Sequence, residues 1–281
     1  MKMKTVAQLL GAATVALGAS SVQAYNLPLP SGTFLLSDNS AENLIKGAGN
    51  TGTTLEVGDK LHGIFLIDDV AGQSILAGSG YDELTGVFET EVLTAGGGPG
   101  NYTWTFGPSA AFEATYGVGA MIAYFTDPVH EYVRQTNSGQ TEAQMEALVT
   151  NGSLLWVASM VDGANFWRSN AATNDTALPG VPPNTAFGQY QWGLDITVNN
   201  SGKEIKQVSC FNIDTLSASM VDQCGNGQVI SPAPSTGFTT PYAVWDDQNI
   251  NMNLVPEPTT LALLGVTLLG FGATRRAKKS A

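Results

Sequence analysis

Apolar and polar residues alternate along several segments of the chain, with the period of two that is typical of a half-buried β-strand. Residues 189–198 show this alternation most clearly, with aromatic and aliphatic side chains on one face. The turn-forming residues 199–202 follow, so 204–213 is predicted to be the return strand of a hairpin. Residues 101–106 alternate in the same way and predict another strand.

A short motif occurs twice. Residues 59–65 and 82–88 share the pattern D-x-L-x-G-(I/V)-F at an offset of 23 residues. Two copies are too few for a solenoid, which needs about three repeats or more. We therefore expect two related strands that lie in one sheet.

Helical periodicity is convincing only in residues 141–149, where acidic residues suit the N-terminal half and Asn151-Gly152 suits the end. Two stretches rich in Asn, Thr, Pro and Gly, residues 169–186 and 225–241, are predicted to be long surface loops. The predicted fold is all-β, an antiparallel β-sandwich or jelly-roll-like domain with one short helix.

The distribution of charge excludes some partners. The 281 residues carry a formal net charge of −12, and six of the twelve basic residues lie in the two terminal tails. Residues 25–255 keep six basic against twenty-three acidic residues, a net charge of −17. Phosphate backbones and anionic lipid surfaces would repel such a body, so no nucleic-acid partner is predicted.

The first 24 residues have the order of a secretory signal peptide. Lys2 and Lys4 precede an apolar stretch, and Val22-Gln23-Ala24 supplies small residues at the −3 and −1 positions of an A-x-A type cleavage site. The apolar stretch is too short to span a bilayer comfortably, which disfavours an N-terminal membrane anchor. We predict cleavage by signal peptidase after Ala24.

The other end of the chain contains three parts in a fixed order. Pro256-Glu257-Pro258 is followed by the apolar run 259–274 and then by a basic cluster, which consists of Arg275, Arg276, Lys278 and Lys279. As a helix, the sixteen apolar residues would extend about 24 Å, slightly short of a hydrocarbon core of about 30 Å. The basic cluster favours the cytoplasmic side, so the body of the chain is expected on the far side of the membrane.

These three parts together resemble the PEP-CTERM sorting signal of Gram-negative bacteria. The resemblance covers about 26 of the 281 residues. It implies processing by exosortase, a membrane transpeptidase-like enzyme that removes the tail and releases or transfers the protein, commonly in bacteria that make exopolysaccharide. The alternative interpretation is an ordinary C-terminal membrane anchor.

The expected organisation follows from the two ends. Residues 1–24 form a signal peptide, 25–254 a single extracytoplasmic β-rich domain, and 255–281 the sorting signal with its transmembrane helix. The protein is expected to be held in the inner membrane transiently and then to reach the cell surface or the extracellular matrix.

Few residues suggest chemistry in the body. Cys210 and Cys224 are the only cysteines, and in an exported protein they are predicted to form a disulfide, with two free buried thiols as the alternative. His62 and His130 are the only histidines and have no zinc-ligand spacing. The local motifs of serine hydrolases and nucleotide binders do not occur, so no catalytic residue is predicted.

Neighbouring carboxylates are found at several places, which are Asp68-Asp69, Asp82-Glu83, Glu89 with Glu91, and Asp246-Asp247. A glycosidase needs two carboxyl groups that face each other across a cleft, whereas neighbours on a strand point to opposite faces. Glu89 and Glu91 share a face that is expected to be solvated. Residues 68–69 and 246–249 offer the oxygen ligands that calcium prefers, but without EF-hand spacing, so no cofactor is predicted.

The leading hypothesis is a non-enzymatic, exported protein of the exopolysaccharide, biofilm or floc matrix, as the resemblance implies; one subgroup of that family is associated with flocculation. A lectin-like surface protein is the first alternative, with polysaccharide stacked on tryptophans that are more often core residues. These tryptophans are Trp104, Trp156, Trp167, Trp192 and Trp245. A hydrolase of matrix polysaccharide that uses carboxylates such as Glu89 or Asp246 is the third reading.

Overall fold

The computed structural model describes residues 25–51, 54–132, 140–172, 186–212, 215–230 and 244–255. The elements in chain order are β1 (Gly32–Ile45), β2 (Lys60–Val70), β3 (Gln73–Ser74), β4 (Glu83–Gly98), β5 (Asn101–Pro108), α2 (Ala110–Tyr116), β6 (Ala120–Asp127), α3 (Glu142–Val149), β7 (Ser153–Ser159), β8 (Phe166–Ala171), β9 (Ala186–Asn199), β10 (Glu204–Ile205), β11 (Val208–Asn212), β12 (Ser217–Val221), β13 (Gln223–Ile230) and β14 (Val244–Val255).

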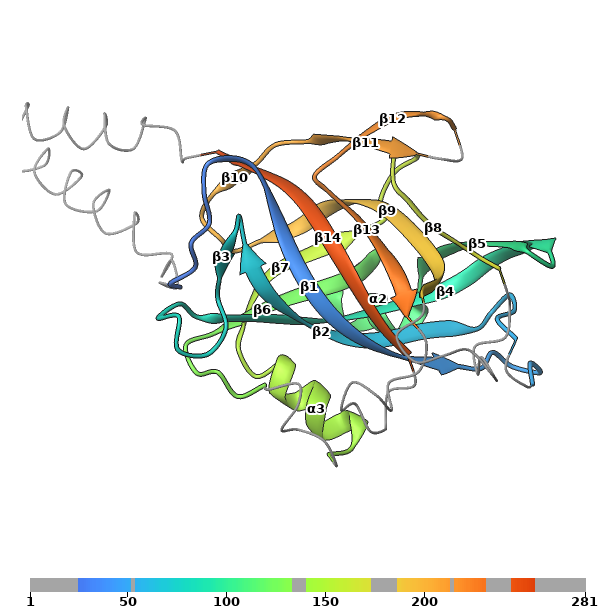
Figure 1. Cartoon of the computed structure of the whole chain (residues 1–281), viewed down its shortest axis with the longest axis horizontal. Helices are drawn as coiled ribbons and strands as arrows, with labels where there is room; N and C mark the ends of the chain where they lie inside the picture. Colours follow the sequence, from blue (N-terminus) through green and yellow to red (C-terminus); the bar gives the residue numbers. More distant parts are fainter. Residues whose placement is uncertain are drawn as a thin grey trace, which may run out of the picture.

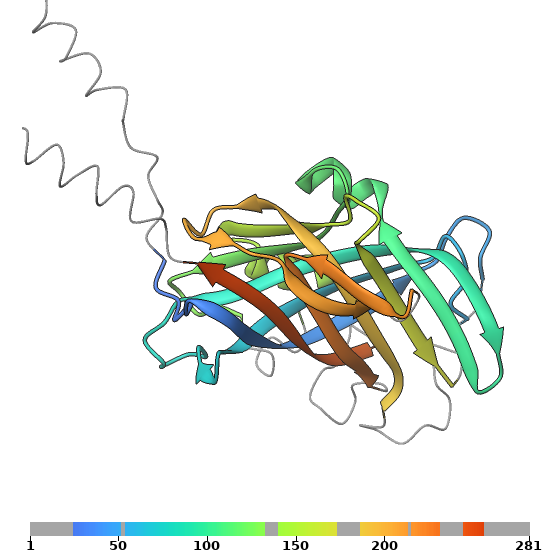
Figure 2. The same ribbon diagram turned by 90° about the horizontal axis from the view of Figure 1, so that it is seen from above.

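Eight strands close into an antiparallel β-barrel (Figures 1 and 2). Around the barrel the order is β1, β14, β13, β9, β7, β6, β4 and β2, and β2 pairs again with β1. The predicted sandwich is therefore wrong. Because β2 is paired on one edge with β1 and on the other with β4, the sheet closes on itself instead of ending where a second sheet would face it.

Between β4 and β9 the barrel wall consists of two strand pairs instead of one. β4 pairs with β6 along its first half and with β5 along its second half. β9 pairs with β8 along its first half and with β7 near its end. Since β5 also pairs with β8, and β6 with β7, two short strand pairs fill the wall between β4 and β9, one beyond the other.

The repeated motif explains the closure between β2 and β4. Gly63 lies opposite Phe88 and Gly86 lies opposite Phe65 in the antiparallel register. A Cβ on Gly63 would lie 2.4 Å from the Phe88 ring, and one on Gly86 would lie 2.2 Å from the Phe65 ring. Each glycine therefore makes room for the aromatic ring of the other copy, and the expectation of two related strands in one sheet is confirmed.

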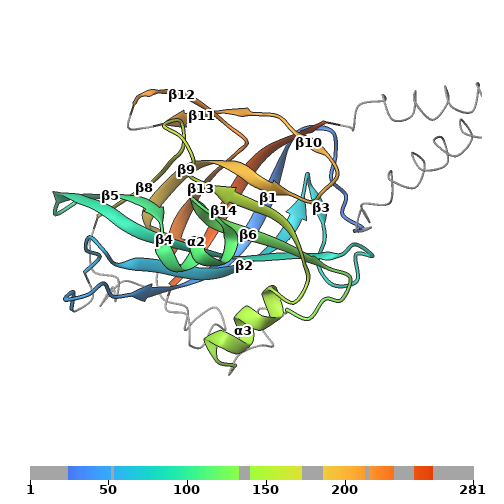
Figure 3. The ribbon, with the colours of Figure 1, turned by 180° about the vertical axis from the view of Figure 1, so that it is seen from behind.

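Two apolar clusters lie on the two sides of the wall. The larger one fills the barrel and includes the fully buried Trp156, Trp192 and Tyr124. The second lies outside, where α3 covers β2 and β4 (Figure 3). The helix predicted at 141–149 is confirmed as α3, and the Thr141 side chain and Gln144 form a capping box at its start. The short helix α2 was not predicted.

Other local predictions had mixed outcomes. The strands at 101–106 and 189–198 are confirmed as parts of β5 and β9. The predicted hairpin is wrong, because β10 pairs with β14 and β11 pairs with β12, so neither returns along β9. Both predicted loops are wrong at their edges: β8 continues to Ala171 and β9 begins at Ala186 in the loop predicted at 169–186, and β13 continues to Ile230 in the loop predicted at 225–241.

The membrane-directed segments lie outside the described residues. They comprise the signal peptide with Ala24, the motif Pro256-Glu257-Pro258, the apolar run 259–274 and the basic cluster Arg275, Arg276, Lys278 and Lys279. Within the described ranges, no helix is long and apolar enough to cross a membrane. The division of the chain at residues 24 and 255 stays a prediction.

Candidate functional site

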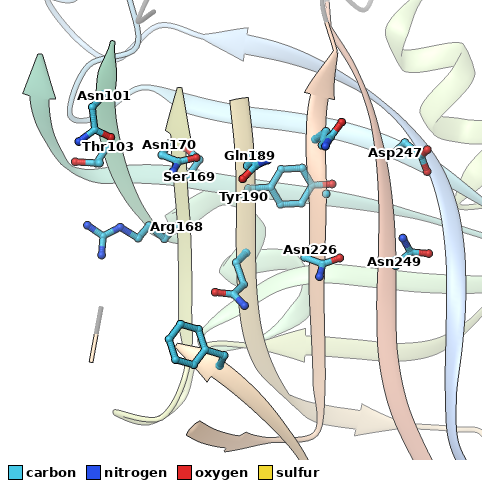
Figure 4. A pocket seen from close by; sticks show the side chains of 14 residues that line it. Asn101, Thr103, Arg168, Ser169, Asn170, Gln189, Tyr190, Asn226, Asp247 and Asn249 are labelled. Atoms are coloured by element: carbon cyan, nitrogen blue, oxygen red, sulfur yellow. The ribbon is translucent and has the colours of Figure 1, made fainter. Parts of the chain in front are cut away.

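An open groove of about 750 Å³ runs across the outer face of neighbouring strands from β5 to β14 (Figure 4). Two rows of polar side chains lie on this face, each formed by residues directly opposite one another on adjacent strands. Nine of the twelve residues line the groove, whereas Thr105, Asn39 and Ser37 extend the rows beyond it. The first polar row consists of Thr103, Asn170, Gln189, Gln228, Asp247 and Asn39. The second polar row consists of Thr105, Arg168, Gln191, Asn226, Asn249 and Ser37.

Strand alternation places these rows outside the barrel. Tyr190 and Trp192 point into the barrel, so their neighbours Gln189 and Gln191 point outward. Glycines replace side chains on the inner face of β13, because a Cβ on Gly225 or Gly227 would collide with the ring of Trp192 or Tyr190. The large rings inside and the amides outside are thus two consequences of one alternating pattern.

A small hairpin borders the groove. β11 and β12 pair with each other and pack on the barrel through Phe166, Val208 and Val221. The Cys210–Cys224 disulfide, with a Cα–Cα distance of 6.2 Å, joins β11 to β13. The predicted disulfide is confirmed. It fastens the hairpin that carries Phe211, whose side chain lines the groove and is 54% exposed.

A charged cluster outside the barrel joins α3 to the wall. The His62 ring lies 3.3 Å from a Glu89 oxygen, 3.6 Å from Glu146 and 3.8 Å from Glu142. Lys60 forms an ion pair of 3.1 Å with Glu89, and Ser109, the N-cap of α2, donates a hydrogen bond to the same carboxylate.

The pKa values in this cluster reflect its mixed charges. Burial lowers the pKa of His62, but the interactions with Glu146 and Glu89 outweigh it and raise this pKa to about 9. The interaction with His62, together with the hydrogen bonds from Ser109 and Lys60, lowers the pKa of Glu89 to about 2 against the effect of burial. The expectation that Glu89 is solvated is wrong, because its neighbours in the fold cover it.

A second carboxylate cluster lies inside the barrel. It consists of Asp38 and Glu42 on β1 and Asp246 on β14, all buried. Gln248 donates its backbone and side-chain N–H groups to Asp38, and Tyr190 donates to Asp246 over 2.5 Å. Burial is the main cause that raises the pKa of all three carboxyl groups.

The other candidate residues are not brought together as a catalytic or metal site. Glu89 lies outside the barrel and Asp246 inside it, so the wall separates the two carboxylates. The calcium-like run 246–249 is divided in the same way, with Asp246 and Gln248 inward and Asp247 and Asn249 outward. Among the described residues, no group of three or more His, Cys, Asp or Glu has a geometry that could hold a metal ion.

The two ends of the described body lie close together. Tyr25 donates a hydrogen bond to the Ser201 carbonyl, and the Lys203 ammonium donates to the Leu29 carbonyl over 2.5 Å. Val255 pairs with Glu204 only a few residues further on. The segments that precede residue 25 and follow residue 255 therefore join the barrel at the same end.

A comparison with known families identifies the segment that follows the barrel. The model of the PEP-CTERM protein-sorting motif matches residues 254–276. The chain carries a PEP-CTERM sorting signal. The signal makes it an exported protein that is processed by exosortase, through membrane-anchored sorting to the cell surface. No curated protein and no solved structure matches the chain.

Sequence reasoning found the sorting signal but not the groove. The signal consists of consecutive residues, whereas the polar rows combine single residues of six strands that are distant in the chain. The available hint was the alternation of Asn and Gln with aromatic or apolar residues in 189–192 and 249–253.

Proposed function

We propose that the mature protein is a non-catalytic component of the exopolysaccharide matrix of a biofilm or floc. The PEP-CTERM signal at residues 254–276 carries this proposal. The barrel adds support, because both membrane-directed segments join it at one end. A folded domain held in this way presents the rest of its surface to the surroundings before exosortase removes the tail.

The absence of catalysis is part of the proposal. A glycosidase places two carboxyl groups on either side of the scissile bond. Glu89 and Asp246, the carboxylates considered for this role, are separated by the barrel wall. The lectin-like alternative cannot use tryptophan platforms at Trp104, Trp156, Trp167 or Trp192, because all four are buried; the Trp245 side chain lies outside the described residues.

The test is the intact mass of the protein in membrane and extracellular fractions of the producing bacterium. We expect an extracellular species that begins at Tyr25 and ends near Val255, with any additional mass from an attached glycan. A strain with Pro256→Ala and Pro258→Ala is expected to retain the uncut protein in the membrane and to lose floc or biofilm mass. Thr259→Ala, next to the motif, is the matched control and should be processed normally.

Two results would overturn the proposal. One is a membrane species that keeps Arg275 to Lys279 while the matrix contains no cut form. The other is an unchanged biofilm and floc in a strain whose protein is fully retained in the membrane.

A further inference from the structure

We propose that the two polar rows on the outer face of the barrel bind an extended chain of a neutral polysaccharide. The inference rests on the proposed function in one respect only, which is that the polysaccharide is taken to come from the matrix around the bacterium. It depends on three observations: the composition of the rows, their geometry and the exposed aromatic ring beside them.

The composition of the rows matches the chemistry of sugar hydroxyls. A side-chain amide offers both donors and acceptors, as each hydroxyl of a neutral sugar does. Of the twelve side chains in the two rows, only Arg168 and Asp247 are charged, and their charges cancel. In the described part of the chain, the side chains of Gln189, Gln191, Asn226 and Gln228 form no hydrogen bond with other protein groups.

The intrinsic β-strand preferences of amino acids do not explain why asparagine occurs in the two polar rows. Asn is depleted in β-strands, yet Asn170, Asn226 and Asn249 occupy paired positions on three of them. All three side chains are exposed, so packing does not compensate for the unfavourable choice. Residues with an unfavourable strand preference that packing does not compensate are expected at functional sites.

The geometry of the rows suits a single extended chain. The rows cross six neighbouring strands, and five strand spacings of about 4.8 Å give a length of about 24 Å. The two rows are two residues apart along each strand, or about 7 Å. A linear polysaccharide laid across the strands would meet a pair of polar side chains at each one.

The border of the groove supplies an apolar contact. Phe211 lines the groove and leaves 54% of its side chain exposed, on the hairpin that the disulfide fastens to β13. The apolar C–H face of a sugar ring can pack on such a ring while its hydroxyls bind amides. Charge argues against an acidic polymer, since residues 25–255 carry a net charge of −17.

The test is affinity electrophoresis of the mature domain, residues 25–255, purified with its disulfide from the periplasm. The gels contain hydroxyethylcellulose, galactomannan or dextran as neutral polymers, and alginate as the acidic one. We expect retardation by at least one neutral polymer and none by alginate. The double variant Asn226→Asp with Gln228→Glu, which keeps side-chain volume and removes the amide N–H donors to the sugar oxygens, should weaken binding by about tenfold or more.

Two further variants locate the contact. Phe211→Ala should weaken binding by about threefold to tenfold if the ring packs on sugar. Asn253→Asp is the matched control, because Asn253 lies on the outer face of β14 but outside both rows. It should change binding less than about twofold. Thermal unfolding of each variant shows that the barrel is retained.

Several results would overturn the inference. They are no retardation by any of the three neutral polymers, retardation by alginate alone, or equal weakening by the double variant and by Asn253→Asp. If the protein is cut and found in the matrix but binds no polymer, the groove inference fails and the proposed function stands. If it binds through the rows but is never cut or released, the proposed function fails and the inference stands.

Discussion

Two carboxylate clusters on opposite sides of the barrel wall have opposite electrostatic environments. Outside, Glu89 lies between Lys60 and His62, and its pKa is lowered to about 2. Inside, Asp38, Glu42 and Asp246 form none of the ion pairs found in the part of the chain that the structure describes. Burial raises their pKa values, and the Asp246 charge raises that of Glu42 further.

The difference shows that the same residue type can stabilise or destabilise one fold. Glu89 favours the folded state when it is charged, since its partners are positive or donate hydrogen bonds. The inner carboxyl groups favour the folded state when they hold protons, because charge inside the barrel is neither solvated nor neutralised. Within the described ranges, one of the two Asp246 oxygens accepts no hydrogen bond.

The largest expected effect comes from removing the central cation of the outer cluster. His62→Ala would remove the shared partner of Glu89 and Glu146, and breaking the buried pair of His62 with Glu89, both about 12% exposed or less, costs about 3 kcal/mol. Urea unfolding at pH 6 should show this loss. A loss below about 0.5 kcal/mol would mean that the cluster behaves as an exposed ion pair.

The pH dependence of the same variant checks the cause. The pKa of folded His62 is about 9, above its ordinary value of 6.5, so its stabilisation is complete below pH 6.5 and is lost as the pH rises to about 9. The difference in unfolding free energy between wild type and His62→Ala should therefore shrink over this range. A constant difference would point to lost packing instead of lost charge.

An intermediate effect of opposite sign is expected inside the barrel. Glu42→Gln keeps a donor toward Asp246 and removes one titrating group, so it should stabilise the protein by about 1 to 2 kcal/mol at pH 8. A raised carboxyl pKa stabilises the folded state below the unfolded value, and this contribution is lost as the pH rises through the folded value. The gain should accordingly disappear at pH 4, in urea unfolding at both pH values.

Asp38→Asn is the matched comparison for that prediction. Asp38 accepts hydrogen bonds from the Gln248 backbone, the Gln248 side chain and the Ser40 hydroxyl, and an amide has only one oxygen to accept them. We expect this variant to gain less than Glu42→Gln or to be destabilised. Equal gains at pH 4 and pH 8 for Glu42→Gln would contradict the electrostatic explanation.

The inner cluster also shows where prediction from sequence reaches its limit. On β1 the inward positions begin with Phe34 and Leu36 and continue with Asp38, Ser40 and Glu42. Alternation predicts strands correctly, but a polar residue on the inward face cannot be told from one on the outward face by its type alone. The contents of the barrel therefore had to come from the structure.

The closure of the sheet into a barrel could not be predicted from the sequence for a related reason. The strands of a sandwich and of a barrel show the same alternation, and they differ in which edges pair. β9 takes β13, β8 and β7 as neighbours, none of which follows it directly with a tight turn. The sorting signal and the disulfide were predictable, because one depends on consecutive residues and the other on only two cysteines.

The smallest expected effect separates the two helix carboxylates near His62. The Glu142 and Glu146 side chains are similarly exposed, at 36% and 40%, but Glu142 lies 3.8 Å from the ring against 3.6 Å for Glu146, and it also accepts a hydrogen bond of 3.3 Å from Asn43. The pKa of Glu146 is lowered, chiefly by its interaction with His62. Glu142→Gln should therefore change the unfolding free energy by less than about 0.5 kcal/mol, as exposed ion pairs do.

A double-mutant cycle of Glu142→Gln and Glu146→Gln with His62→Ala measures this difference at pH 6. We expect the coupling of His62 to Glu146 to exceed its coupling to Glu142, because Glu146 lies closer to the ring. The reverse order would show that His62 fastens α3 through the first turn of the helix. The contrast between the outer and inner clusters would then rest on Glu89 and Glu142 instead of Glu89 and Glu146.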